Sequence, residues 1–118
     1  MSKALKIIEA LGRHEDAEAI SVLRDLGTNS SRDDVREETA KALIRRNCEE
    51  SLRIVIANQG KGINDLNAKV ALSTVSSLLE LQDKTELMRI LNETIDSEQD
   101  ESVRNTARSL RALINLSE

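Results

Sequence analysis

The stretch DDVREETAKAL, residues 33–43, has an acidic start followed by apolar residues at helical spacing, and it ends in Leu43. An aspartate at position 33 or 34 can cap the first turn, so we expect a helix from there to about residue 47. The same leucine position recurs at intervals of 32, 35 and 35 residues, at Leu11, Leu43, Leu78 and Leu113. The stretch is therefore expected to be one copy of a repeated unit.

Further positions stay in register with these leucines. Three positions earlier stand Ile8, Ala40, Val75 and Leu110. Nine and twelve positions after the first three leucines stand Ile20, Leu52 and Leu87, and then Leu23, Val55 and Ile90. A small hydroxyl group recurs at Thr39, Thr74 and Ser109. Amphipathic helices match in part by chance, but this agreement includes two helices and the turn between them, which favours a true repeat.

The composition predicts an almost entirely helical chain. The 118 residues include no proline, four glycines and no aromatic residue, with 39% hydrophobic and 32% charged residues. Proline breaks helices and glycine weakens them, and no segment alternates with a period of two, so we expect no strands. Helical periodicity and stop signals predict seven helices, over residues 2–13, 16–26, 33–47, 49–58, 64–82, 83–96 and 102–116.

Short connections between these helices favour antiparallel neighbours in a single domain that covers residues 1–118. One helix pair cannot bury its apolar stripe alone, whereas stacked pairs share a continuous core. We therefore expect an all-α fold of about three helix pairs after an N-terminal half-repeat. The expected boundaries are 1–13 for the half-repeat and 14–47, 48–82 and 83–118 for the pairs.

The repeated residues resemble HEAT-type repeats. DDVREETAKAL looks like the second helix of such a repeat, and ESVRNTARSL, residues 101–110, carries the Val-Arg pair and an alanine again. Residues 35–63 are also similar to armadillo repeats, although two helices in 32 to 35 residues fit HEAT better. The resemblance covers nearly the whole chain and implies a right-handed α–α superhelix, which is an α-solenoid.

The resemblance also implies contacts between neighbouring repeats. In HEAT-like proteins acidic and arginine residues tend to form a ladder from one repeat to the next, and here Asp34, Arg36 and Arg104 match that pattern. The middle copy departs from it, because residues 64–72 contain no Val-Arg pair. We therefore expect the ladder to be interrupted at the second helix pair.

The function that the resemblance implies is a scaffold or adaptor that binds another protein without catalysis of its own. Its concave surface would come from the second helices, around residues 34–46, 64–82 and 102–116. The candidate protein-binding residues are basic side chains of two of these helices: Lys41, Arg45, Arg104, Arg108 and Arg111. Those of the last helix could instead form the polar outer face that a terminal repeat needs. Self-association or membership in a larger solenoid also fits the pattern.

An alternative is an accessory protein related to the HEAT-like phycobilin lyases, which attach tetrapyrroles to light-harvesting proteins. No aromatic or histidine cluster in the sequence indicates a pigment pocket. A relative of HEAT-like DNA-repair glycosylases is disfavoured by the net charge of −4 and by the lack of aromatic side chains that could stack on bases. We therefore expect no nucleic-acid partner.

The residue types suggest no catalytic, cofactor-binding or metal site. His14 is the only histidine and has no second ligand in a metal-binding motif. Cys48 is the only cysteine, and we expect a buried thiol and a reducing, cytoplasmic location. The glycines of residues 58–62, NQGKG, lack the spacing of a phosphate loop and are expected to end a helix. No apolar run is long enough to span a membrane, so we expect no membrane partner.

Overall fold

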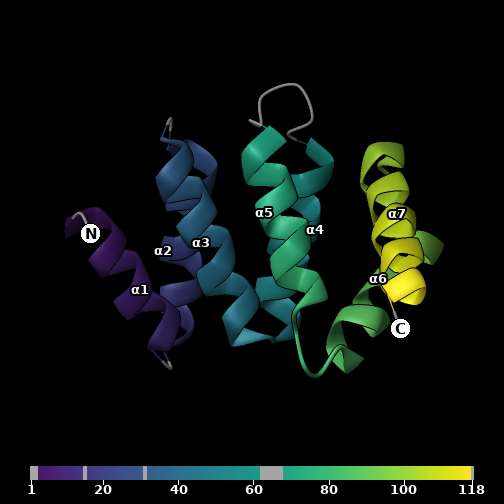
Figure 1. The fold of residues 1–118 in the computed structure, drawn as a ribbon, viewed down its shortest axis with the longest axis horizontal. Coiled ribbons are helices and arrows are strands. Elements are labelled where there is room, and N and C mark those ends of the chain that lie inside the picture. The colour runs from purple at the N-terminus through teal and green to yellow at the C-terminus, as the bar shows by residue number, and fades with distance from the viewer. Residues whose placement is uncertain (1–2, 15, 31, 62–67, 118) are drawn as a thin grey trace.

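Seven α-helices and no strand make up the residues that the computed structural model describes, which are 3–14, 16–30, 32–61 and 68–117 (Figure 1). The helices are α1 (Lys3–Arg13), α2 (Ala17–Asn29), α3 (Asp33–Arg46), α4 (Glu49–Lys61), α5 (Ala68–Leu79), α6 (Thr85–Ser97) and α7 (Glu101–Ser117). The predicted all-α class is confirmed. Each expected pair contains two consecutive helices, and their descent from one repeated unit stays a prediction.

The helices lie in two rows (Figure 1). In the front row α1 packs on α3, α3 on α5 and α5 on α7, while in the rear row α2 packs on α4 and α4 on α6. Across the rows α2 contacts α3 and α6 contacts α7, and α7 also packs on α4. The molecule measures 39 × 30 × 26 Å, and α1 and α7 lie at opposite ends of its long direction.

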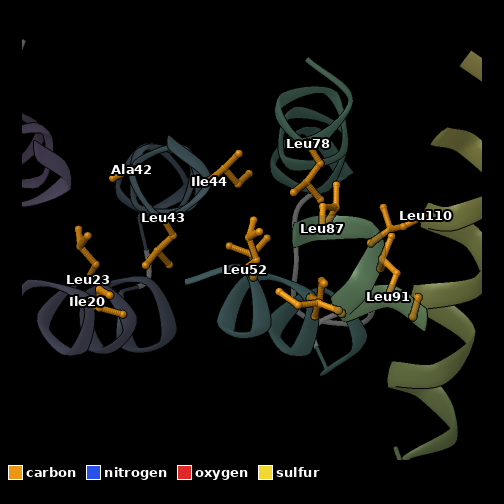
Figure 2. Packing of buried hydrophobic residues seen from close by; sticks show 14 of the residues in the cluster. Ile20, Leu23, Ala42, Leu43, Ile44, Leu52, Leu78, Leu87, Leu91 and Leu110 are labelled. Atoms are coloured by element: carbon orange, nitrogen blue, oxygen red, sulfur yellow. The ribbon is translucent and has the colours of Figure 1, made fainter. Parts of the chain in front are cut away.

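An aliphatic core extends between the two rows (Figure 2). The two first-helix columns of the predicted repeat are buried throughout: Ile20, Leu23, Leu52, Val55, Leu87 and Ile90. The core side chains labelled in Figure 2 reach from Ile20 and Leu23 at one end to Leu91 and Leu110 at the other. Burial of this apolar surface is the main favourable contribution that holds the rows together.

The second helices follow the predicted repeat only in part. Leu43 and Leu78 are 2% and 1% exposed, as the repeat predicts, and Leu11 packs partly buried against the core. Leu113 is 40% exposed, so its predicted place in the core is wrong. α7 instead buries a different set of side chains: Val103, Ala107, Leu110 and Ile114.

The difference amounts to a two-residue change of register. Val35 of α3 and Val103 of α7 are both buried and stand 68 positions apart, whereas Leu43 and Leu113 stand 70 apart. An α-helix turns by about 100° per residue, so an offset of two residues carries a side chain off the core face. Ser109 is exposed for the same reason. The Val-Arg motif therefore marks the buried face of α7, and the leucine spacing does not.

Three predicted helix ends differ from the structure by three residues. α2 continues through Gly27 and α4 continues through Gly60, because a single glycine weakens a helix by only about 1 kcal/mol. α5 ends at Leu79, three residues before the predicted end. The first part of that prediction, residues 64–67, lies outside the described residues.

α1 and α3 approach each other closely at Gly12. A Cβ atom built on Gly12 would lie 2.8 Å from the Cβ atom of Ala42, which is closer than side chains pack. Arg46 of α3 donates through Nη1 to the carbonyl oxygens of Leu11, at 3.3 Å, and of His14 at the end of α1. The lack of a Cβ atom on Gly12 allows α1 to approach α3 closely, and the hydrogen bonds from Arg46 stabilise this contact.

Candidate functional site

α3 and α5 lie side by side in the front row and border a groove of about 330 Å³. Its lining residues come from the second half of α3, from the C-terminal part of α5 and from the turn that follows: Lys41, Ile44, Arg45, Ser77, Glu80 and Leu81. Two of the five basic residues predicted from the sequence, Lys41 and Arg45, therefore lie together at this groove.

The base of the groove is aliphatic because of how the two helices pack. Leu43 and Leu78 are buried in the core, one from α3 and one from α5 (Figure 2). Ile44 follows Leu43 and projects from α3 on the side of α5, where it is only 2% exposed. Leu81 is half-buried and packs against the same core from the other side. The groove thus joins an aliphatic base to a charged rim.

The uncharged polar groups at the groove already have partners. The Ser77 hydroxyl donates to the carbonyl oxygen of Ser73 at 3.0 Å, one turn earlier in α5. The carbonyl oxygen of Leu81 accepts a hydrogen bond from Lys84 Nζ at 2.7 Å. Polar recognition of a partner at this groove would therefore come mainly from its charged side chains.

The charge of Lys41 is balanced by its own helix. Lys41 Nζ lies 3.3 Å from Glu37 Oε1 and 3.9 Å from Glu38 Oε1, at the helical spacings of four and three residues. Glu37 also accepts a hydrogen bond from Ser73 Oγ at 3.0 Å, which links α3 to α5. Glu37 therefore both pairs with Lys41 and links α3 to α5.

Arg45 and Glu80 are the other two charged residues that line the groove. Both side chains are exposed, and neither forms an ion pair within the part of the chain that the structure describes. Arg45 lies in the last turn of α3, where a cation interacts favourably with the helix dipole. The two helices that border the groove thus each contribute one charge, of opposite sign, without an ion pair in the described residues.

The three predicted basic residues of α7 do not join this groove. Arg111 Nη1 donates to Asn92 Oδ1 of α6 at 3.0 Å, and Arg108 Nη1 donates to Asn105 Oδ1 in its own helix at 3.2 Å. Arg104 has a buried Nε atom without a hydrogen-bond partner in the described structure. The five predicted basic residues therefore do not share one site. Two of them line the groove, and the three arginines of α7 each have different surroundings.

The residues matched to a ladder between repeats make contacts near their own helix pair. Arg36 Nε donates to the carbonyl oxygen of Ser30 at 2.7 Å, where α2 ends. Asp34 Oδ1 accepts a hydrogen bond from Arg32 Nε at 3.0 Å, and this bond lowers the pKa of the Asp34 carboxyl group. Polar contacts that do reach a neighbouring unit are made by residues that the resemblance did not single out, such as Arg46 to the carbonyl oxygen of Leu11.

An ion-pair network between α4 and α6 was not predicted. Arg53 Nη2 lies 3.0 Å from Glu49 Oε1 and also pairs with Glu93, while Arg89 Nη2 lies 3.4 Å from Glu49 and 2.7 Å from Glu86. Arg89 Nη1 lies 2.9 Å from Glu93. The spacings of three and four residues could have indicated the pairs within one helix, but the pairs between α4 and α6 depend on how these helices pack.

The network changes the acidity of its carboxyl groups. The hydrogen bond from Arg89 lowers the pKa of Glu86 below its usual value, and the hydrogen bond from Arg53 lowers that of Glu93. The same pairing with Glu86 raises the pKa of the Arg89 guanidinium. Because these groups are exposed, solvent and salt screen their interactions, and the network acts as an orienting contact between α4 and α6.

His14 and Cys48 make local contacts. His14 Nδ1 accepts a hydrogen bond from the backbone N–H of Asp16 at 3.1 Å, and Cys48 is half-buried with its sulfur 3.2 Å from Ser51 Oγ. Across the described ranges, no three His, Cys, Asp or Glu side chains are grouped so that they could hold a metal ion. None of the helices there combines the length and the apolar character that a membrane span requires.

No family model, no curated protein sequence and no solved structure matches this chain. Its function is therefore inferred from the residues and contacts described above.

Proposed function

We propose that this chain is a protein–protein interaction scaffold of the HEAT-like α-solenoid type, and that the groove between α3 and α5 binds a helical segment of another protein. The observation that carries the proposal is the position of Lys41 and Arg45 beside the aliphatic Ile44 and Leu81, between two neighbouring helices of the front row. In this proposal the helix pairs form a right-handed superhelix with a concave front row, and the protein acts in the cytoplasm without catalysis of its own.

The contacts along each row support a solenoid. In repeat proteins each unit packs mainly on its neighbours, and here α1, α3, α5 and α7 contact one another in that order, as do α2, α4 and α6. The contact of α7 with α4 departs from a regular stack. It accompanies the change of buried face in α7, and within the described part of the chain α4 makes little contact with α5, its partner in the expected pair, so the packing is most regular from α1 to α3.

A helical segment suits the shape and chemistry of this groove. An amphipathic helix binds by placing its apolar stripe in a groove, with its polar residues at the edges. The half-buried Leu81 and the edge of Ile44 would meet the aliphatic stripe, and the charges at the rim would meet the flanks. Buried apolar contacts would supply affinity, and the charges would supply orientation and specificity.

Two arginine substitutions on adjacent residues of α5 test the proposal. Ser77 lines the groove, whereas Ser76 is exposed and does not line it. A library of displayed amphipathic helical peptides is selected on the wild-type protein, and the enriched peptides are titrated against both variants. Ser77→Arg should weaken binding by at least about tenfold because it fills the groove, while Ser76→Arg should bind as the wild type does.

The comparison of Ser77→Arg with Ser76→Arg decides the outcome. Far-ultraviolet circular dichroism confirms that both variants keep their helices. If Ser77→Arg binds the selected peptides as tightly as Ser76→Arg does, the groove is not the binding site. The alternative function, an accessory protein related to phycobilin lyases, stays a hypothesis that predicts a shifted visible absorbance band when the protein is mixed with a linear tetrapyrrole.

A further inference from the structure

Resting on the proposed function, we infer that the partner helix carries an acidic residue on one flank of its aliphatic stripe and a basic residue on the other, and that these pair with Arg45 and Glu80. This inference specifies the chemistry of the partner. It excludes a partner whose contact surface carries charges of one sign only.

The charged residues that line the groove differ in whether they already form ion pairs. Lys41 is already neutralised by Glu37 and Glu38 of its own helix, at 3.3 and 3.9 Å. Arg45 and Glu80 are exposed and have no ion-pair partner in the described ranges. The partner is therefore selected by one cation and one anion, although the groove lining includes two cations and one anion.

The charges of Arg45 and Glu80 come from different helices. Arg45 belongs to α3 and Glu80 follows the end of α5, so the two charges line the groove from different helices. A helix in the groove would cover its base with an apolar stripe and would place one flank against each wall. A complementary partner thus needs one acidic and one basic flank.

A partner helix with the wrong flanking charges would bind with a free-energy cost. Docking removes water from the rim, and a charge that loses water without gaining a counter-charge weakens binding. A helix with two acidic flanks would satisfy Arg45 and repel Glu80, and one with two basic flanks would do the reverse. The same argument disfavours a polyanion such as nucleic acid, since Glu80 stands at the rim.

Three helical peptides of equal length, which share one leucine stripe, provide the probe. One carries glutamate on one flank and lysine on the other, one carries glutamate on both flanks, and one carries lysine on both. The wild-type protein should bind the mixed peptide at least about tenfold more tightly than either single-sign peptide. Binding is measured by calorimetry at low and at high salt, and the preference should shrink as salt screens the charges.

Charge reversal in the protein sharpens the test. Glu80→Arg should transfer the preference to the doubly acidic peptide, and Arg45→Glu should transfer it to the doubly basic peptide. The double variant carrying both substitutions should prefer the mixed peptide again, because a helix can enter the groove in either direction. Both side chains are exposed, so these substitutions should leave the fold intact, which circular dichroism checks.

The outcomes distinguish this inference from the proposed function. If all three peptides bind equally and Ser77→Arg abolishes that binding, the groove is a docking site and the inferred charge pairing is wrong. If no peptide binds, or if Ser77→Arg leaves binding unchanged, both the proposed function and the inference are overturned. Retained preference for the mixed peptide in the Glu80→Arg variant would also contradict the pairing.

Discussion

α3 and α7 carry the same Val-Arg motif in different surroundings. Both are helices with an acidic first turn, and both bury the valine of the motif. α3 lies between α1 and α5, whereas α7 lies at the end of the front row and packs on α6 and α4. α3 buries Leu43, while α7 exposes Leu113 and Leu116. The local pattern of apolar residues predicts each helix, but the neighbouring helices decide which face is buried.

The arginines of the two motifs differ in the same way. Arg36 donates at 2.7 Å to the carbonyl oxygen of Ser30, where α2 ends. Arg104 is the matching residue of α7, and its buried Nε has no hydrogen-bond partner in the described structure. An unsatisfied buried donor costs free energy, whereas a satisfied one stabilises the contact between helices. Identical motif residues can therefore have opposite effects on stability.

The largest predicted effect separates the two possible registers of α7. Leu43→Ala and Leu110→Ala should each lower the free energy of unfolding by about 2–5 kcal/mol, because both side chains are buried and their truncation leaves a cavity. Leu113→Ala should cost less than about 1 kcal/mol, because its side chain is 40% exposed. Urea unfolding followed by circular dichroism measures all three. A greater loss for Leu113→Ala than for Leu110→Ala would contradict the buried face assigned to α7.

The second prediction concerns the close approach of α1 to α3, a contact that α7 lacks. Gly12→Ala should destabilise the protein by about 1–3 kcal/mol, because the new Cβ would lie 2.8 Å from the Cβ of Ala42 and the helices would have to separate. Adding Ala42→Gly should recover part of that loss, although a second glycine in a helix has its own cost of about 1 kcal/mol. If Gly12→Ala proves neutral or stabilising in urea unfolding, α1 does not approach α3 as described.

The third prediction compares the two arginines directly. Arg36→Met should lower the free energy of unfolding by about 1 kcal/mol or more, because it removes a hydrogen bond from a part-buried carbonyl group. Arg104→Met should be neutral or stabilising, because methionine keeps much of the aliphatic stem and removes the unsatisfied Nε donor. Thermal unfolding of both variants is the measurement, and an equal loss in the two would remove the contrast between α3 and α7.

The smallest predicted effect is the acid sensitivity of the α4–α6 contact beside α7. The folded-state pKa values of Glu86 and Glu93 are lowered, so the unfolded chain binds more protons in acid. Their contribution to stability is present above the unfolded pKa, near 4.3 (about the usual value for glutamate), and is lost as the pH falls through the folded pKa.

Two glutamine variants isolate that contribution. Glu93→Gln should flatten the fall of the unfolding midpoint between neutral pH and acid, because its ion pairs with Arg53 and Arg89 are removed. Glu50→Gln is the matched control, since Glu50 is exposed and forms no ion pair in the described ranges. Equal acid sensitivity in the two variants would show that the network does not stabilise the α4–α6 contact.

Much of the fold could be predicted from the sequence because it depends on local periodicity. The predicted burial of the first-helix columns is confirmed. Residues such as Leu52 and Leu87 lie in rear-row helices whose apolar stripe faces the core. The glycine stops were wrong at Gly27 and Gly60, because helix packing outweighs the propensity of a single glycine. The predicted burial of Leu113 was wrong, because burial at this position depends on the helices that pack around α7.

The groove itself was not predicted, and only two of its lining residues, both on α3, were among the predicted binding residues. Lys41 and Arg45 were named because they are basic residues of a second helix. Ser77, Glu80 and Leu81 were missed, because their meeting with α3 depends on how α5 packs and on where it ends. The sequence also could not show that Lys41 forms ion pairs whereas Arg45 forms none in the described residues, because this depends on side-chain geometry.

The most direct test of the two-row arrangement is the distance between its ends. Spin labels placed at the exposed Ile7 of α1 and Leu116 of α7, in a Cys48→Ser background, report that distance by electron paramagnetic resonance. The described arrangement places α1 and α7 at opposite ends of the 39 Å long direction of the molecule, so it predicts that the two labels lie far apart. A separation near the axial distance of touching helices, about 8–10 Å, would show a closed bundle and would contradict it.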